Sequence, residues 1–455
     1  MVNDMDLEKI KSLMNEIISR SREYGFEDAA VYYSDHESMS VDILNGEVSA
    51  YENSRDSGFT FKGLKDGQMG TSSTNMIDDD TIDYLLSSAM ENCEVLNDED
   101  PDFIYCDPDH KELFYSQLSG AYDKNTYERF KDLGLKIEKA ILDIDPCVKA
   151  VDYLSIACSI GPAIMANSKG LYAYTDEDGI SLYAGARAEK DGVVKSGGHY
   201  WVGKDIDDFD MDKFIDKVKD NLITKFGASS VNSGSYDVII TNEAFVSLFK
   251  AFFGNFSSYA MQKGLSLLAG REGEKIASDI FTLSEIPMYE KALTKIPFDT
   301  EGVITFDKEI IDKGVFKTAL YNLKTANKEG RKSTGNGFGG AIGATNLVVK
   351  EGEKSFDELM ESVGNGLIIT DVSGLHAGVN SISGDFSLLS EGFVIENGKK
   401  GRPVEQITIS GNFYKMLFNI TEVGNDTVNV PGSRGEFFSP SVVIKAMDVA
   451  GDTNE

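Results

Sequence analysis

One stretch of the chain, residues 371–413, restricts the possible folds more than any other part of the sequence. It reads DVSGLHAGVNSISGDFSLLSEGFVIENGKKGRPVEQITISGNF and combines many Gly, Ser and Asn residues with regularly spaced apolar residues. A solvated linker would lack these apolar residues, so the glycines indicate tight turns between short buried strands. Asn397-Gly398 supplies the positive φ angles that a tight turn needs, which predicts a hairpin over residues 392–409.

The N-terminal half alternates amphipathic helices with β-rich runs. Apolar residues recur at helical spacing between residues 6 and 22. Four β-rich runs follow, AAVYYSD, ESMSVDIL, EVSAYEN and GFTFKGL, with strong hairpin signals at Asn45-Gly46 and Asp66-Gly67. A second series of strand-like runs, residues 157–203, is flanked by helical patterns. The simplest arrangement for this second series is an antiparallel meander.

These patterns predict an α+β protein in three parts. Residues 1–96 form a first α+β subdomain and residues 110–226 a second one, each combining helices with antiparallel sheet. Residues 234–451 form a C-terminal, antiparallel β-rich, barrel-like domain. The acidic segment 97–109 is either a crossover or an Ω-like surface loop. The small-residue segment 227–235 is typical of a linker at a domain boundary.

Composition and charge exclude several classes of protein. The formal charge of -31, from 44 basic and 75 acidic residues, repels phosphate backbones, so we expect no direct nucleic-acid binding. No run approaches the roughly 20 apolar residues of a membrane span, and the N-terminus lacks the apolar core of a signal peptide. We therefore expect a cytoplasmic protein that does not bind membranes. The four cysteines have no CxxC spacing and are expected to be reduced, structural thiols.

Six motifs in the C-terminal half occur in a fixed order. They are PFDTEG (297–302), STGN (333–336), TNL (345–347), GVNSISGDFS (378–387), GFVIENG (392–398) and EQITISGN (405–412). This set resembles the TldD/PmbA family and is most similar to its PmbA branch, also called TldE. The resemblance implies a cytosolic metallopeptidase system, a hydrolase for peptides, in which TldD-type and PmbA-type chains assemble. Members of the family have also been called modulators of DNA gyrase. The acidic charge indicates that any such effect is indirect.

The resemblance also indicates where a zinc site would lie. The TldD branch carries His-Glu-x-x-x-His on a helix, in which two imidazoles hold zinc and the glutamate is the base for a bound water. Here we expect one long helix over residues 242–264, and the matching segment, Leu248–Gly254, contains neither His nor Glu. The zinc-bearing branch also has a cysteine near its C-terminus, whereas the last cysteine of this chain is Cys158. We therefore expect no metal or other cofactor in this chain, and zinc in a TldD-type partner.

Two further motifs have alternative explanations. Gly335–Gly340 fits GxGxxG, but a basic pair precedes it and a loop and strand pattern follows. These flanks favour a mobile or substrate-covering loop over a dinucleotide site. Asp299 and Glu301 form a carboxylate pair two residues apart. We expect these carboxylates to hold turns or backbone N–H groups.

Candidate site residues come from the glycine-rich motifs. A lone histidine such as His376 is more often a hydrogen-bonded loop residue than a ligand. Asp385 and Ser387 favour turn capping, since no motif places a histidine as their base. We assign no catalytic residue and no metal ligand. The candidates for peptide contacts are Asn336, Asn346, His376, Asp385 and Asn412.

Three functions remain open from the sequence. In the first, the chain is a non-catalytic peptidase subunit that forms a heterodimer with a TldD-type zinc-bearing homologue and holds extended peptide against a strand edge. In the second, it is a stand-alone hydrolase with a relocated site around His376 and Asp385. In the third, it is a binding or regulatory homodimer without a peptidase partner.

Overall fold

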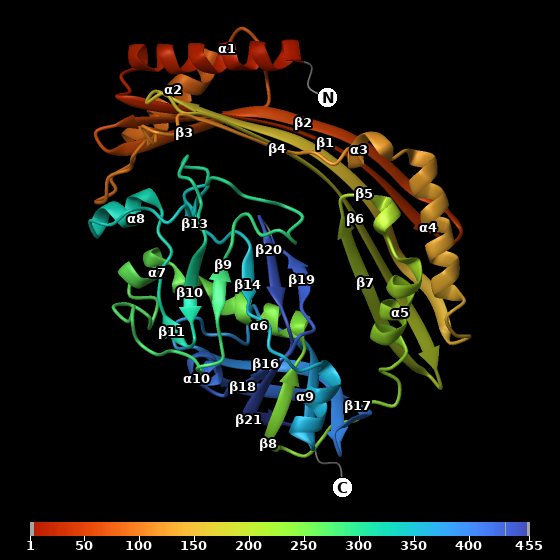
Figure 1. Cartoon of the computed structure of the whole chain (residues 1–455). Helices are drawn as coiled ribbons and strands as arrows, with labels where there is room; N and C mark the ends of the chain where they lie inside the picture. The colour runs from red at the N-terminus through yellow and green to blue at the C-terminus, as the bar shows by residue number, and fades with distance from the viewer. Residues whose placement is uncertain (1–3, 433, 453–455) are drawn as a thin grey trace. The chain divides into compact units, whose positions relative to one another are not determined.

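The computed structural model of the chain describes residues 4–432 and 434–452. Contacts between residues divide it into two compact units (Figure 1). Unit 1 extends to Thr224 and includes Thr300–Val303, and unit 2 comprises Lys225–Asp299 and the chain from Ile304 onward. Each unit has its own sheets and its own core.

Unit 1 is built on one seven-stranded sheet. The strand order is β3-β2-β1-β5-β6-β4, and β7 pairs with β6 as well. All pairings are antiparallel except the parallel β4–β6 pair. Asn45 and Gly46 turn the chain between β1 and β2 with φ angles of 57° and 79°, which confirms that hairpin prediction. The strands are β1 (Asp28–Leu44), β2 (Glu47–Lys65), β3 (Gln68–Thr74), β4 (Glu112–Gln117), β5 (Val148–Asn167), β6 (Tyr172–Lys190) and β7 (Val193–Gly203).

The four N-terminal β-rich runs form two long strands rather than four short ones. β1 contains AAVYYSD and ESMSVDIL, and β2 contains EVSAYEN and GFTFKGL. Asp35, in the middle of β1, is only 1% exposed, and Arg55 of β2 donates hydrogen bonds to both of its carboxylate oxygens. A charged residue does not end a strand when an opposite charge on the neighbouring strand pairs with it.

The long helices of unit 1 cover the same face of this sheet (Figure 1). α1 and α2 share a core with Phe59 and Phe61 of β2. α4 packs on β1 and β5, and α5 packs on β6 and β7. Strands from both expected N-terminal subdomains, 1–96 and 110–226, therefore pair within one sheet. The helices are α1 (Asp4–Arg20), α2 (Thr81–Glu94), α3 (Ala121–Lys124), α4 (Tyr127–Leu142) and α5 (Met211–Leu222), with 3₁₀ turns η1 (Ser21–Tyr24) and η2 (Ile206–Asp208).

A closed sheet forms one part of unit 2. The order is β17-β16-β15-β8-β21, and β17 also pairs with β21, so these strands close into a barrel to which β18 is added. β16 and β17 turn at Asn397 and Gly398, whose φ angles are 51° and 75°, as the hairpin prediction required. The expected antiparallel, barrel-like C-terminal fold is confirmed, with one parallel pair, β8–β15. These strands are β8 (Gly234–Ile240), β15 (Gly366–Ser373), β16 (Asp385–Glu396), β17 (Lys399–Asn412), β18 (Ile420–Val423) and β21 (Val442–Ala450).

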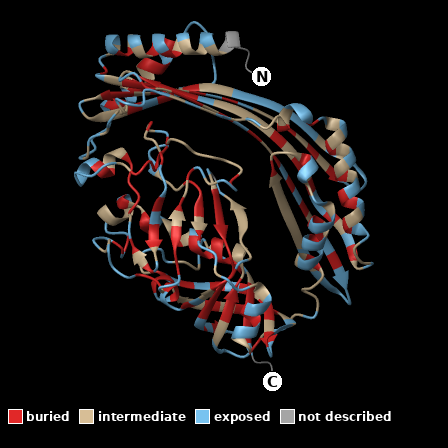
Figure 2. Cartoon of the chain, in the orientation of Figure 1, coloured by how far each residue is buried: buried red, intermediate tan, exposed pale blue. Residues whose placement is uncertain are grey.

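A six-stranded sheet and helix α6 complete the core of unit 2. The sheet order is β11-β10-β9-β14-β20-β19, and α6 contacts strands of both sheets. Buried residues are concentrated on these strands (Figure 2). The strands are β9 (Leu283–Glu285), β10 (Lys308–Asp312), β11 (Val315–Phe316), β14 (Leu347–Val349), β19 (Val428–Pro431) and β20 (Glu436–Ser439), beside the hairpin β12 (Gly337–Phe338) and β13 (Ala341–Ile342). The helices are α6 (Asn242–Phe253), α7 (Ser258–Gln262), α8 (Leu323–Lys328), α9 (Phe356–Val363) and α10 (Phe413–Phe418), with the 3₁₀ turn η3 (Gly254–Phe256).

The single long helix expected over residues 242–264 is interrupted. α6 ends at Phe253, and η3 and the short α7 follow it. Asn255 in the interruption is 3% exposed; its Nδ2 donates to the Ser381 carbonyl at 2.9 Å, and its own carbonyl accepts from Ser266 Oγ at 2.7 Å. These tertiary hydrogen bonds stabilise the break, which begins at Gly254, a poor helix former. None of the described helices is long and apolar enough to cross a membrane.

The small-residue segment 227–235 is attached to unit 2. The Arg402 guanidinium donates to the backbone carbonyls of Ser229 and Ser230, both at 2.9 Å. Ser229 also forms a parallel bridge with Val404. The segment therefore belongs to the edge of the barrel, and the division between the units falls slightly before it, after Thr224.

Candidate functional site

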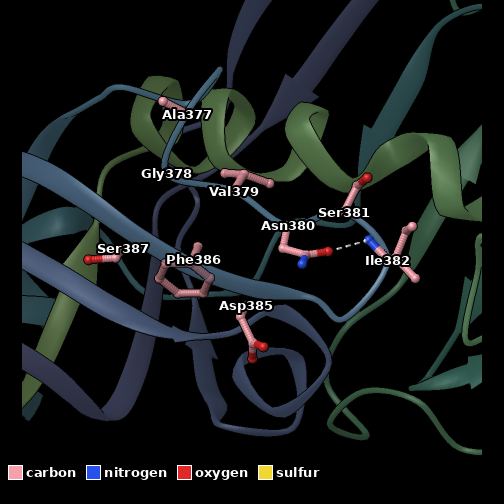
Figure 3. A pocket seen from close by; sticks show the side chains of 9 residues that line it. All are labelled: Ala377, Gly378, Val379, Asn380, Ser381, Ile382, Asp385, Phe386 and Ser387. Carbon is pink, nitrogen blue, oxygen red and sulfur yellow. Dashed lines mark hydrogen bonds between the residues drawn. The ribbon is translucent and has the colours of Figure 1, made fainter.

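An open pocket of about 620 Å³ lies at the connection between β15 and β16 (Figure 3). Its walls are residues 377–382 and 385–387, within the glycine-rich stretch that most restricts the fold. The pocket is large enough to hold an amino-acid side chain or a small ligand.

Hydrogen bonds hold the pocket loop from two sides. The Asn380 side-chain Oδ1 accepts from the backbone N–H groups of Ile382 and Ser383, each at 3.1 Å, and Figure 3 shows the first of these bonds. This is the local turn that asparagine favours. From the opposite side Asn255 donates to the Ser381 carbonyl. The interruption after α6 therefore helps to position the pocket wall.

Asp385 is the only ionisable side chain among the described residues that line the pocket. Asn412 Nδ2 donates to its Oδ1 at 2.9 Å, and Ser383 Oγ donates to its Oδ2 at 2.8 Å. These bonds, the one from Asn412 first, lower the pKa of the Asp385 carboxyl below its ordinary value. The carboxylate is therefore ionised at neutral pH and can accept hydrogen bonds from a ligand. Of the five candidates for peptide contacts, the structure brings Asp385 and Asn412 together.

His376 does not join this pair. It is exposed in a turn in which the Ala377 N–H donates to the Gly374 carbonyl at 3.0 Å. Within residues 4–432 and 434–452, neither His376 nor Ser387 makes a side-chain hydrogen bond to Asp385. Asp385 instead holds the turn that begins β16. The arrangement is not that of a Ser-His-Asp triad, which requires the histidine to contact both other members.

Asn336 and Asn346 are completely buried. Asn336 Nδ2 donates to Glu285 Oε1 and to the Gly343 carbonyl, both at 2.8 Å. Asn346 Nδ2 donates to two backbone carbonyls, and its Oδ1 accepts from the Glu436 N–H at 2.9 Å. Both side chains therefore make their hydrogen bonds inside unit 2, away from the pocket loop.

Glu285 is the centre of this buried polar cluster. It is 0% exposed, and Lys308 Nζ donates to its Oε2 at 2.9 Å. Its Oε1 accepts from the backbone N–H of Thr345 at 2.6 Å and from the Thr345 hydroxyl at 2.8 Å. The STGN and TNL motifs thus supply partners for a buried ion pair, which needs such additional hydrogen bonds to be tolerated.

The helix that would carry zinc in a TldD-type chain contributes only hydrocarbon to the core here. In the matching segment Leu248–Gly254, the Phe249 ring lies 5.3 Å from the Phe413 ring and 5.6 Å from the Phe437 ring. Lys250 donates to the Pro431 carbonyl at 3.1 Å. Protein zinc sites use Cys, His, Asp or Glu ligands, so this segment does not fit a zinc ion. In the described part of the chain, no group of three or more such residues is placed to hold a metal.

The GxGxxG segment Gly335–Gly340 is part of a hairpin. β12 and β13 pair across Gly339 and Gly340, whose φ angles are 61° and 84°. A dinucleotide site requires a helix directly after the glycines, and here a strand follows. Asp299 Oδ2 accepts from the Gly337 N–H at 2.8 Å, as expected for a carboxylate that holds backbone N–H groups.

Sequence reasoning did not single out Asn255, Asn380, Glu285 or Lys308. For Asn380 a local signal was present, since Asn followed by Ser-Ile-Ser-Gly is typical of a side-chain-capped turn. Glu285 precedes the apolar Ile286, which is a weak signal for a buried charge, whereas Lys308 stands between Asp307 and Glu309 and had no local signal. Asn255 had no local signal, because its partners are distant in the sequence.

Comparison with known proteins places this fold in a family. Residues 29–93 match the PmbA/TldA metallopeptidase domain 1, residues 122–226 match the central domain, and residues 233–451 match the C-terminal domain. A protein of Thermotoga maritima, described as a candidate modulator of a DNA gyrase, has a crystal structure with a TM-score of 0.85 and 31% identity, covering 97% of this chain and 100% of that one. The chain belongs to the PmbA/TldD family of metallopeptidases.

Relatives from the PmbA branch are similar over nearly the whole chain. Metalloprotease PmbA of Escherichia coli O157:H7 is 26% identical over 455 residues, which is 98% of each chain. TldE from Thermococcus kodakarensis is similar in fold, with a TM-score of 0.84 and 20% identity over 96% of this chain and 100% of that one. The family resemblance seen in the ordered motifs is thereby confirmed.

Proposed function

We propose that this chain is the substrate-binding, non-zinc subunit of a peptidase and acts together with a zinc-bearing TldD-type homologue. The observation that carries the proposal is the chemistry of α6. Segment Leu248–Gly254 presents aromatic and aliphatic carbon to the core, and Phe249 is 0% exposed. Segment Leu248–Gly254 therefore has no donor for zinc and no general base for a metal-bound water. Metal and catalysis then come from the partner chain.

Two features of unit 2 support peptide binding. The pocket beside Asp385 combines open volume with an ionised carboxylate that can accept peptide N–H groups or a basic side chain. β19 stands at one end of the six-stranded sheet, and its residues are partly exposed. An extended peptide can add to such an edge through main-chain hydrogen bonds, which accept many sequences.

The proposal is tested by measuring peptide cleavage with this chain alone, with the zinc-bearing homologue alone and with both together. We expect cleavage to require the homologue and to increase when this chain is added. Zinc content of the lone chain should be far below one ion per chain. Full cleavage activity of the lone chain, or one tightly bound zinc per chain, would contradict the assignment.

A pair of variants separates peptide binding from assembly. Asp385→Asn should raise the KM of the mixed enzyme for peptides and leave kcat nearly unchanged, because the side chain contacts the ligand and not the metal. Asp371→Asn is the matched control, since Asp371 also accepts from a serine hydroxyl and is exposed, but does not line the pocket. Equal KM values for Asp385→Asn and Asp371→Asn would show that Asp385 does not contribute to peptide binding.

A further inference from the structure

The sheet of unit 1 contains the same three-residue pattern, Tyr-x-Asp, on two parallel strands. β1 carries Tyr33 and Asp35, and β6 carries Tyr174 and Asp176. Both tyrosines lie opposite the same residue of the intervening strand, Ile164 of β5. In each pattern the tyrosine hydroxyl donates to Oδ2 of the aspartate, at 3.4 Å on β1 and 2.8 Å on β6. Both tyrosines belong to the core under α1 and α2, so both patterns face the side of the sheet that the helices cover.

The similarity extends to the next strand outward in the sheet, which is β2 beside β1 and β4 beside β6. On β2, Phe59 lies opposite Tyr33 and Ser57 opposite Asp35. On β4, Phe114 lies opposite Tyr174 and Ser116 opposite Asp176. The two sites therefore present the same four types of side chain in the same register.

The two sites differ in whether a cation pairs with the aspartate. Arg55 on β2 donates through Nε to Asp35 Oδ1 at 2.8 Å and through a terminal nitrogen to Oδ2, which forms a bidentate pair. Asp176 is 7% exposed, and its Oδ1 is buried without a hydrogen-bond partner among the described residues. β4 ends at Gln117 and supplies no counterpart of Arg55. A buried carboxylate oxygen without a partner is unfavourable, which favours a partner that the described residues do not supply.

The aromatic pair beside Asp176 is also open to a ligand. Phe59 is 1% exposed, whereas Phe114 is 74% exposed. The Phe114 ring stacks on Tyr174 with centroids 4.8 Å apart and planes 6° from parallel. An exposed ring face next to a carboxylate favours a guanidinium, because the planar cation can stack on the ring and pair with both carboxylate oxygens.

We propose that Asp176 and Phe114 form a binding site for a guanidinium group. Arg55 on Asp35 is the internal example of the same recognition. Asp178, the next acid on this face, does not compete, since its oxygens accept from Ser119 and from the Ala121 N–H. Binding requires the buried Oδ1 of Asp176 to become accessible to the ligand. The guanidinium belongs either to an arginine within a polypeptide or to a free small molecule. The site lies within unit 1 and is independent of the proposed peptidase role.

The inference is tested by calorimetric titration of the full chain with three probes. They are the blocked tripeptide Ac-Ala-Arg-Ala-NH₂, its citrulline counterpart, which has the same shape without the charge, and agmatine. We expect saturable binding of the arginine peptide and none of the citrulline peptide. Agmatine binding as tightly as the peptide assigns the site to free guanidinium compounds. Weaker agmatine binding assigns it to arginine in a polypeptide. Equal binding of arginine and citrulline peptides, or no saturation with any guanidinium probe, overturns the inference.

Variants locate the binding on the protein. Asp176→Asn is nearly isosteric and should weaken binding of the arginine peptide by about tenfold or more. Phe114→Ala changes a residue that is 74% exposed, and should weaken binding several-fold. Glu177→Gln is the control, because it removes the same charge from an exposed neighbouring residue of β6 that points to the other face. Unchanged affinity in both Asp176→Asn and Phe114→Ala refutes the site.

Discussion

Replacing Lys308 by Met should destabilise unit 2 strongly, because it leaves Glu285 as a buried, unpaired carboxylate. The Lys308 side chain is 3% exposed, the Glu285 side chain is 0% exposed, and their charged atoms are 2.9 Å apart. Removing one partner of a buried ion pair costs about 3–5 kcal/mol. For a unit of roughly 200 residues, 1 kcal/mol corresponds to about 2–4 °C in Tm. The variant should therefore unfold roughly 6–20 °C below the parent.

Differential scanning calorimetry measures this shift, and the single tryptophan provides an internal reference. Trp201 lies on β7 of unit 1, so its fluorescence follows the unit that does not contain the substitution. The double variant Glu285→Gln/Lys308→Met removes both charges and keeps an acceptor for Thr345. It should recover at least half of the lost stability. A loss below about 1 kcal/mol in the single variant, or no recovery in the double variant, would show that the pair is not a buried structural charge pair.

Three further predictions concern pH and the pocket loop. Burial lowers the pKa of His199 to about 4 from 6.5, so the unfolded chain takes up a proton that the folded chain does not. Because His199 is only partly buried, its contribution to stability should fall by roughly 1–2 kcal/mol from pH 6.5 to 4 in urea titrations, and His199→Phe should remove this contribution. Asn255→Ala should lower the free energy of unfolding by about 1–3 kcal/mol and speed hydrogen exchange in residues 377–384, whereas the control Lys263→Ala should change neither. Unchanged exchange in Asn255→Ala would contradict the hydrogen bond that anchors Ser381. The depressed pKa of Asp385 means that its hydrogen bonds are present above the ordinary aspartate pKa and are lost as pH falls through the folded value. NMR signals of the loop should therefore titrate below the ordinary aspartate pKa, and identical titration in Asp385→Asn would contradict this.

Turn chemistry allowed much of the sheet structure to be predicted. Asn45-Gly46 and Asn397-Gly398 adopt positive φ angles at hairpin turns because few other residue pairs tolerate that conformation. The ordered motifs identified the family, and apolar periodicity between residues 6 and 22 located α1. These signals are local, so they are readable without coordinates.

The failures of prediction have a common physical origin. AAVYYSD and ESMSVDIL were treated as separate runs, yet both lie in the single strand β1, where Arg55 on the next strand pairs with Asp35. The predicted helix extended past the end of α6 and through Asn255, because the hydrogen-bond partners of Asn255, Ser381 and Ser266, lie elsewhere in the chain. In each case a tertiary partner outweighed the local preference.

The candidate site was identified only in part for the same reason. Asp385 and Asn412 were chosen from the motifs and are in contact, 2.9 Å apart. Asn336 was chosen on the same grounds, but it is buried against Glu285. The STGN motif suggested that Asn336 matters, and only the packing showed that its hydrogen bonds go to Glu285 and to the Gly343 carbonyl.

Residue order alone was sufficient for the α+β class, the hairpins, the family and the apolar character of α6, because these depend on composition, spacing and backbone preferences within a few residues. The tertiary structure decided the pairing of Glu285 with Lys308 and the pocket beside Asp385. It also decided that one Asp176 oxygen is buried without a hydrogen-bond partner in the described part of the chain. Burial and hydrogen bonding of a polar group depend on which strands meet and in which register. Those contacts join residues far apart in the chain, where local sequence patterns contain no information about them.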